Sequence, residues 1–343
     1  MVTAQPEFYR TSPDEQVQRL AELARAALPQ WGLQGASVTP VAYRENMTFK
    51  VDAGGRGAFA FRIHQAGYRT DAQIQSELDL MGYLNAEGIR TPKVVPTESG
   101  SLFTTVTSAG VGEPRQCDLF EWIEGKALRE TGQGLDVPLT ELTAFYAEVG
   151  RIAASIHNAT ARWQRPPGFE RPAWDSEGIF GVNAHLGDFR RLGDVTDEQK
   201  HLLAEIAEKV EEALAAFGQA PDRYGLSHCD FLAENLFICD DGIRLLDFDD
   251  AGDSWYLFDL CTAVFDLLET PAYEACLEST LTGYRERREL PDDHLKMIPA
   301  FVMARILSYL GWCAKKTHMP QTAWMKPVLL YAAEKYGAEF LRR

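Results

Sequence analysis

The chain has 343 residues, 45% of them hydrophobic, and a net charge of −16 from 34 basic and 50 acidic side chains. That hydrophobic content supports a sizeable core and excludes a disordered chain, and the length allows one large domain or two ordinary ones. The acidic balance, with no Lys/Arg cluster, argues against nucleic acid or an anionic membrane surface as a partner.

Six scattered cysteines, without a Cys-x-x-Cys pair, predict reduced thiols and no zinc site. The N-terminus lacks the basic and apolar segments of a signal peptide. The most apolar stretch, 297–313, is interrupted by Pro299, Arg305 and Ser308, so it predicts a buried helix of a globular protein. We therefore expect a cytoplasmic protein.

The first predicted element is a helix with Ser12 as its N-cap, Pro13 at the first helical position and Glu15 three residues after the cap. Three short strands are predicted next, at 37–43, 48–52 and 58–64. A tip at 44–47 joins the first two strands, and a glycine-rich turn joins the second and third.

The third of these strands carries Arg62 in an alternating pattern, and the helix predicted at 71–85 carries Glu77 beside its apolar face. An ion pair between them is one interpretation, and an exposed position for each is the other. Two further strands are predicted at 94–95 and 102–106.

From about residue 140 the pattern changes to helices. Helices are predicted at 142–159, 197–217, 297–316 and 322–341, of which 197–217 is amphipathic, with a long irregular connection at 162–187. His157 closes the first of them as a packing or loop-bracing residue, and Asp259 is expected to open a helix or to brace a loop. Arg305, if buried, requires a partner, either an acidic group of a substrate or a structural carboxylate.

The stretch 225–259 carries the chemistry. It contains His228-x-Asp230-x-x-x-x-Asn235, a strand at 236–238, a turn at 240–242, and a returning strand that leads to Asp247. Such a hairpin predicts that these oxygen-bearing side chains converge at one end of it. Phosphoryl transfer needs hard oxygen ligands for magnesium and a carboxylate that orients and deprotonates a hydroxyl. Asn235 and Asp247 suit the metal, and Asp230 suits the base.

This stretch resembles the catalytic and metal-binding loops of the kinase-like phosphotransferases. That group includes aminoglycoside phosphotransferases, choline kinases, type II homoserine kinases, hydroxylysine kinases and a bacterial stress-response kinase. Protein kinases carry His-Arg-Asp-x-x-x-x-Asn and Asp-Phe-Gly at the corresponding places. This chain has His-Cys-Asp and Asp247-Phe248-Asp249, the latter similar to the small-molecule enzymes.

The resemblance covers about residues 37–315 and implies a bilobal, protein-kinase-like α+β fold with ATP in the cleft. It implies a small N-terminal lobe with an antiparallel sheet at 1–116, a hinge at 117–125, and a mostly helical C-terminal lobe at 126–343. At the hinge, backbone groups of Glu121 and Ile123 are expected to bind the adenine.

The same resemblance implies an enzyme that uses ATP and Mg²⁺. Asp230 is the expected base, and Asn235 and Asp247 the expected metal ligands. Arg62, in place of the usual lysine, is expected to hold the nucleotide phosphates with the help of Glu77. His228 is expected to brace the loop, while Asp249 and Asp250 are further candidates for binding metal or acceptor.

The acidic and aromatic residues after the hairpin favour a small acceptor that bears an amine as well as a hydroxyl. An amino alcohol or an amino acid such as homoserine is the first choice. An aminoglycoside and a protein Ser/Thr hydroxyl are alternatives within the class. An inactive nucleotide-binding regulator is the alternative outside it.

Overall fold

The computed structural model describes residues 7–128 and 137–342. The chain divides into two compact units. The first comprises Met1–Lys126, Arg165–Glu170 and Phe237–Asp249, and the second comprises Ala127–Gln164, Arg171–Leu236 and Asp250–Arg343. The lobe and hinge boundaries at 116 and 125 remain a prediction.

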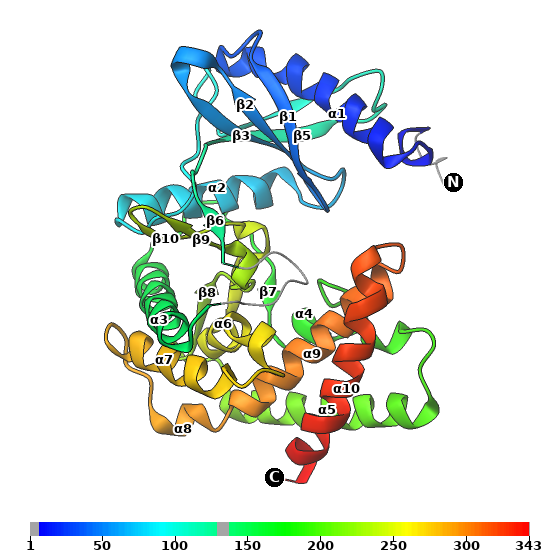
Figure 1. Cartoon of the computed structure of the whole chain (residues 1–343), viewed down its shortest axis with the longest axis vertical. Coiled ribbons are helices and arrows are strands. Elements are labelled where there is room, and N and C mark those ends of the chain that lie inside the picture. Colours follow the sequence, from blue (N-terminus) through cyan, green and yellow to red (C-terminus); the bar gives the residue numbers. More distant parts are fainter. Residues whose placement is uncertain (1–6, 129–136, 343) are drawn as a thin grey trace. The chain divides into compact units, whose positions relative to one another are not determined.

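The first unit is built on a five-stranded antiparallel sheet in the order β1-β2-β3-β5-β4 (Figure 1). Its strands are β1 (Ser37–Tyr43), β2 (Met47–Asp52), β3 (Ala58–Ile63), β4 (Phe103–Val106) and β5 (Arg115–Glu121). The three strands predicted between 37 and 64 are confirmed. The strand predicted at 94–95 is wrong, because Val94 makes only an isolated bridge to Phe120. Pro92 and Pro96 flank this run and leave too few backbone donors for a ladder.

Helix α1 (Pro13–Ala27) covers one face of this sheet (Figure 1). The Ser12 hydroxyl accepts a hydrogen bond from the backbone N–H of Glu15 at 3.3 Å, as the predicted cap requires. Alternate sheet residues, among them Phe49, Phe61 and Leu119, are buried in one core with the apolar side of this helix. Because successive strand residues point to opposite faces, Arg62 points away from this core.

Helix α2 (Asp71–Ala86) confirms the helix predicted at 71–85. Thr70 and Gln73 form a capping box at its start, which satisfies two backbone donors that would otherwise lack partners. The helix buries Ile74, Leu78 and other apolar side chains, and Glu77 among them is completely buried. Glu77 is therefore no surface residue.

The second unit is mostly helical. It contains α3 (Leu139–Arg162), α4 (Ser176–Phe180), α5 (Asp197–Phe217), α6 (Tyr256–Ala263), α7 (Tyr273–Arg285), α8 (Asp292–Leu295), α9 (Ile298–Lys315) and α10 (Pro320–Arg342). Helix α9 is buried along most of its length and packs against α5, α6 and α10. Among the helices of the described residues, none is long and apolar enough to cross a membrane.

Helices α3 and α7 pack closely because glycines lie where they meet. A methyl group on Gly150 of α3 would run into the backbone carbonyl of Thr280, and one on Gly283 of α7 into that of Ala147. The two backbones therefore approach more closely than any side chain at these positions would allow.

Two small sheets complete the fold. One joins β7 (Ala173–Trp174), β11 (Gly252–Trp255) and β8 (Tyr224–Ser227), and the other joins β10 (Gly242–Leu245), β9 (Leu236–Cys239) and β6 (Lys126–Ala127). The predicted strand, turn and returning strand after Asn235 are thereby confirmed. Two expectations are corrected: the connection at 162–187 contains β7 and α4, and the helix expected to open at Asp259 begins at Tyr256.

Candidate active site

Asp230 lies in the second unit, on the loop between β8 and the short 3-10 helix η5 (Ala233–Asn235). Both of its carboxylate oxygens are held. Oδ1 accepts a hydrogen bond from Nη2 of Arg305 at 2.5 Å, and Oδ2 accepts one from Nδ2 of Asn235 at 3.0 Å. The carboxylate still keeps about a fifth of its side-chain surface exposed, at 20%. The predicted base and one predicted metal ligand are thus brought together.

The amide of Asn235 is oriented by Asp230. Its nitrogen donates to the Asp230 carboxylate and, at 2.9 Å, to the Asp230 backbone carbonyl. Among the described residues, none donates a hydrogen bond to the Asn235 amide oxygen. An oxygen in that position suits the coordination of a hard cation.

Arg305 comes from α9 and is completely buried. Besides Asp230, it donates to the backbone carbonyl of Cys229 at 3.3 Å and to the hydroxyl of Tyr309 at 2.6 Å. The sequence left its partner open between a substrate group and a structural carboxylate. The structure pairs it with the carboxylate of Asp230, and its burial keeps it from meeting a substrate directly.

The environment of Asp230 favours its action as a base. Burial raises the pKa of the Asp230 carboxyl, while the Arg305 guanidinium and the Asn235 amide act in the opposite direction. A raised pKa strengthens a carboxylate as a proton acceptor, and the nearby cation keeps it ionised.

Asp259 holds the backbone of the same loop. Its carboxylate accepts hydrogen bonds from the N–H groups of His228 at 3.0 Å and Cys229 at 2.7 Å. It also accepts one from Nε2 of His157 at 3.0 Å. Burial lowers the pKa of His157, so the ring is neutral, and its Nδ1 accepts from the Tyr284 hydroxyl at 3.0 Å. The bracing roles expected for His157 and Asp259 are borne out by these bonds.

His228 and Cys229 complete the loop geometry. Nδ1 of His228 accepts a hydrogen bond from the backbone N–H of Asp230 at 3.2 Å, and a bracing role for this histidine stays a prediction. Cys229 has a left-handed backbone, with φ 67°. Such strain persists where neighbours fix the residue from several sides, as Asp259 and Arg305 do here.

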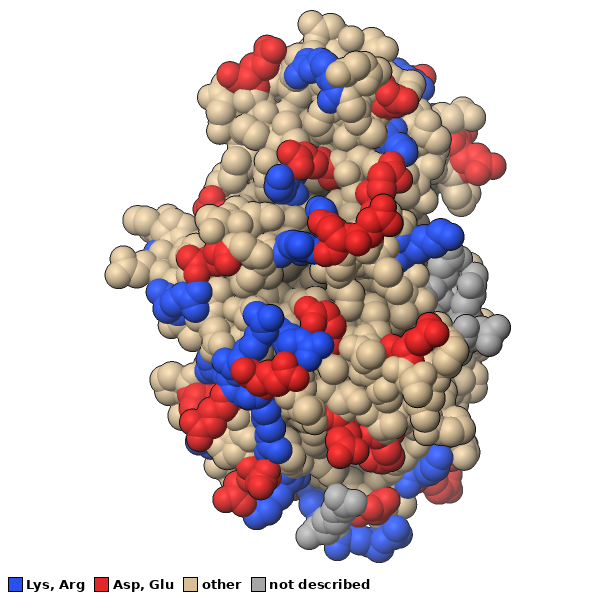
Figure 2. Space-filling model, turned by 60° about the vertical axis from the view of Figure 1, so that its left-hand side comes forward, with Lys and Arg blue, Asp and Glu red and all other residues tan. Residues whose placement is uncertain are grey.

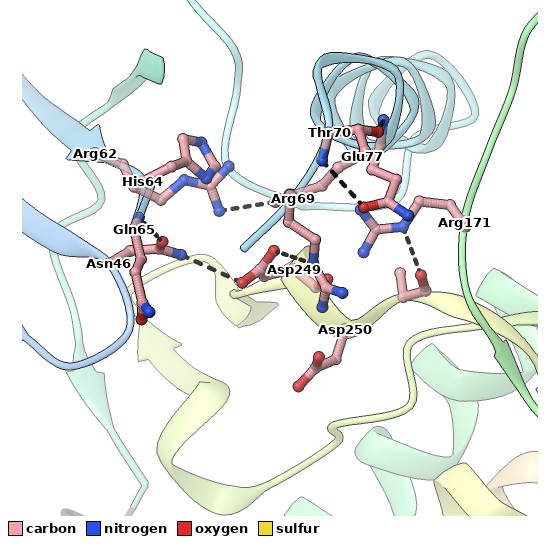
Figure 3. Close-up of polar contacts among 12 residues, drawn as sticks. Asn46, Arg62, His64, Gln65, Arg69, Thr70, Glu77, Arg171, Asp249 and Asp250 are labelled. Carbon is pink, nitrogen blue, oxygen red and sulfur yellow. Dashed lines mark hydrogen bonds and ion pairs between the residues drawn. The ribbon is translucent and has the colours of Figure 1, made fainter. Parts of the chain in front are cut away.

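The first unit contains a buried cluster around Arg62 (Figure 3). Nη1 of Arg62 donates to Glu77 at 2.8 Å, so the predicted ion pair is present. Nε and Nη2 of Arg62 donate to Oδ1 and Oδ2 of Asp118, at 3.0 and 2.7 Å. The carboxylate of Asp118 also accepts from Nε2 of His64 at 2.9 Å. Sequence reasoning missed Asp118 and His64.

This cluster explains why an arginine can stand here. A guanidinium offers a planar fork that holds Asp118 with two bonds and Glu77 with a third, which an ammonium cannot do with the same geometry. Arg62 is only 8% exposed. Burial by itself would raise the pKa of Asp118, but Arg62 and His64 outweigh it and hold that pKa at about 2. Contact of Arg62 with nucleotide phosphates stays a prediction.

Replacing Asp118 with asparagine is expected to lower the free energy of unfolding by about 3 kcal/mol, the lower end for breaking a buried ion pair, because Arg62 loses one of its two buried carboxylate partners and keeps Glu77. Urea denaturation at neutral pH measures this, with the exposed Asp14→Asn as the matched control. The folded-state pKa of Asp118 lies below its unfolded value. Its contribution is therefore present above about pH 4 and lost as the pH falls towards 2. Equal stability of the two variants would contradict the structural role of the pair.

The remaining predicted residues lie in both units. Glu121 ends β5, and its N–H donates to the carbonyl of Lys93 at 2.9 Å. Neither backbone group of Ile123 hydrogen-bonds to a described residue, so both suit an adenine edge. Asp247 follows β10 with a left-handed φ of 60°. Asp250, in the second unit, accepts a bond from the Trp174 indole through its backbone carbonyl at 2.7 Å.

The donor chemistry fits magnesium. In the part of the chain that the structure describes, no three or more His, Cys, Asp or Glu side chains gather as a metal site. Magnesium in phosphoryl-transfer enzymes needs only one or two carboxylates from the protein, with phosphate oxygens and water completing its shell. The carboxylate of Asp247 and the amide oxygen of Asn235 are oxygen donors of that kind, and their role as metal ligands stays a prediction.

Acidic and basic side chains lie among one another on the face shown in Figure 2. Several arginines are paired with neighbouring carboxylates, including Arg19 with Glu15 at 2.6 Å and Arg151 with Glu286 at 3.0 Å. Pairs of this kind locally offset the positive charge that a polyanion would need.

Residues 37–294 match the phosphotransferase enzyme family, APH. The chain belongs to this family. Amicoumacin kinase of Bacillus subtilis (strain 168) is 25% identical over 300 residues, covering 84% of this chain and 83% of that protein. Homoserine kinase of Burkholderia multivorans is 28% identical over 333 residues, covering 87% of each.

Solved structures agree with this assignment. A microcompartment-associated aminopropanol kinase has a TM-score of 0.77 and 32% identity, over 93% of this chain and 95% of that one. Amicoumacin kinase hAmiN, in complex with AMP-PNP, Ca²⁺ and Ami, has a TM-score of 0.74 and 20% identity. The match covers 97% of this chain and 96% of that one. The predicted family, the kinase-like α+β fold and the enzyme class are confirmed. The protein is a small-molecule kinase that phosphorylates a hydroxyl group.

Proposed function

We propose that this protein transfers the γ-phosphoryl group of ATP, with Mg²⁺, to the hydroxyl of a small amine-bearing molecule, such as an amino alcohol or homoserine. The observation that carries the proposal is the carboxylate of Asp230, fixed between Asn235 and Arg305 with a raised pKa. Similarity to an aminopropanol kinase and to a homoserine kinase supports the acceptor class.

In this proposal Asp230 orients the acceptor hydroxyl and takes its proton as the oxygen attacks the γ-phosphorus. Asn235 and Asp247 hold magnesium, which when bound offsets the charge of the phosphates. Ile123 binds the adenine through its backbone. Arg62, helped by Glu77, holds the nucleotide phosphates. Most of the rate enhancement comes from positioning and charge neutralisation.

An amino alcohol is favoured over an amino acid. A carboxylate on the acceptor would need a cation, and Arg305 was the sequence's candidate for that contact. Arg305 is completely buried and committed to Asp230 and Tyr309, so it does not serve an acceptor carboxylate.

The test is ADP release with ATP and Mg²⁺ over a panel of acceptors. The panel pairs 1-amino-2-propanol with its amine-free analogue 1,2-propanediol, and adds ethanolamine, homoserine and spectinomycin. We expect turnover with the amino alcohols and a kcat/KM at least about tenfold lower without the amine, the scale expected for one lost polar contact. Turnover with spectinomycin alone, or equal turnover with and without the amine, would overturn the proposed acceptor class.

A further inference from the structure

Asp249 is buried in the first unit, in the short 3-10 helix η6 (Phe248–Asp250), two residues after Asp247. Side chains of Arg69 and Asn46 donate to it (Figure 3). Nε of Arg69 donates to its Oδ1 at 3.0 Å, and Nη2 of Arg69 donates to its backbone carbonyl at 2.8 Å. Nδ2 of Asn46 donates to its Oδ2 at 3.3 Å.

These bonds do not suit a metal ligand. Each carboxylate oxygen of Asp249 already accepts from a protein donor, and its charge is compensated by Arg69, which is itself only 9% exposed. A cation at this carboxylate would lie beside a guanidinium and face its repulsion. The sequence placed Asp249 among the candidates for binding metal or acceptor, and its contacts point to another role.

Asn46 and Arg69, which bond to Asp249, lie on separate elements. Asn46 is on the tip between β1 and β2, and its amide oxygen accepts the backbone N–H of Gln65, just after β3, at 3.2 Å. Arg69 immediately precedes Thr70, the N-cap of α2, the helix that carries Glu77. One carboxylate therefore connects the hairpin tip, the end of β3 and the start of α2 to the segment of Asp247.

The left-handed backbone of Asp247 also needs neighbours that hold it in place. A left-handed φ of 60° in a residue other than glycine is stable only where the surroundings fix it. Asp249 lies two residues after Asp247. Arg69 holds both the side chain and the backbone carbonyl of Asp249, which restrains the end of that short segment.

We propose that Asp249, held by Arg69 and Asn46, is a positioning residue that fixes the hairpin tip and the Asp247 segment and binds neither metal nor acceptor. That these contacts position the nucleotide and its metal rests on the proposed function. The connection itself is a property of the protein without ligands, so it can be tested separately.

The first experiment is amide hydrogen exchange on the protein without nucleotide or metal. Asp249→Asn and Arg69→Gln are both expected to accelerate exchange in residues 44–48 and 246–250 and to leave α9 unchanged. Asp240→Asn, an exposed carboxylate at the turn of the neighbouring hairpin, is the matched control and should leave all three segments unchanged. Unchanged exchange at 44–48 in both test variants would overturn the proposal, whatever reaction the protein catalyses.

The second experiment compares ATP and Mg²⁺ titrations of the same variants. If Asp249 acts through Arg69, each single variant raises the KM for ATP about tenfold and the double variant is no worse, because both remove one shared interaction. The Mg²⁺ concentration for half-maximal activity then shifts equally in both. A metal ligand at position 249 would instead shift it in Asp249→Asn and not in Arg69→Gln, which would overturn the proposal.

Discussion

Asp230→Asn is expected to lower kcat by about 10²- to 10⁴-fold, the usual contribution of a positioned general base. Asparagine keeps the size of the side chain and one oxygen that can accept from Arg305, but it cannot take a proton. The KM for ATP should stay nearly unchanged, because the effect lies in the chemical step. Steady-state ADP release with a saturating amino alcohol measures both constants.

The matched control for that variant is Asp222→Asn, which removes a carboxylate that pairs with Arg223 on the surface of the same unit. It should leave kcat unchanged. If Asp230→Asn retains kcat within tenfold of the native protein, Asp230 is not the base, and the proton leaves the acceptor by another route.

Arg305→Met is expected to have the second largest effect, on stability and on pH dependence together. Removing one partner of a buried ion pair costs about 3 to 5 kcal/mol, and the lower figure applies because Asp230 keeps part of its surface exposed. Methionine replaces the volume without the charge. Urea denaturation at neutral pH measures the loss against Arg287→Met, at an exposed arginine whose side chain donates to the Ser155 hydroxyl.

The same variant tests the electrostatics of the base. Arg305 holds down a pKa that burial raises, so its removal raises the pKa of Asp230 further. Since the base acts only when ionised, kcat/KM falls as the pH drops through that pKa. The acid limb of the pH profile should therefore move to higher pH in Arg305→Met. An acid limb that stays in place would show that Asp230 does not limit the rate at low pH.

Local signals predicted the framework of the fold well. The cap at Ser12, the alternation in 37–64 and the helical period of 197–217 depend on residues within a turn or two of one another, and each element appears near its predicted bounds. The failures at 94–95 and at the start of α6 came from runs too short to carry a period.

The candidate site was predicted less completely, because its partners come from distant segments. Asp118 faces Arg62 only through the register of β3 and β5, across 56 positions of sequence. An acidic residue between Cys117 and Leu119, inside the apolar part of β5, was the local signal for it. The sequence singled out Arg305 as a charge in an apolar helix, but its partner Asp230 lies 75 positions away. No sequence periodicity relates such residues to one another. They are brought together by the fold of the backbone.

The contact between α3 and α7 has a consequence for how this sequence can change over time. Tyr284 follows Gly283 directly and bonds to His157, which bonds to Asp259, which in turn holds the backbone next to Asp230. A single added methyl group at Gly150 or Gly283 would push the two helices apart and disturb this succession of bonds from its far end. Substitution at these two glycines is therefore constrained by the loop that carries Asp230, although both glycines lie where α3 and α7 meet.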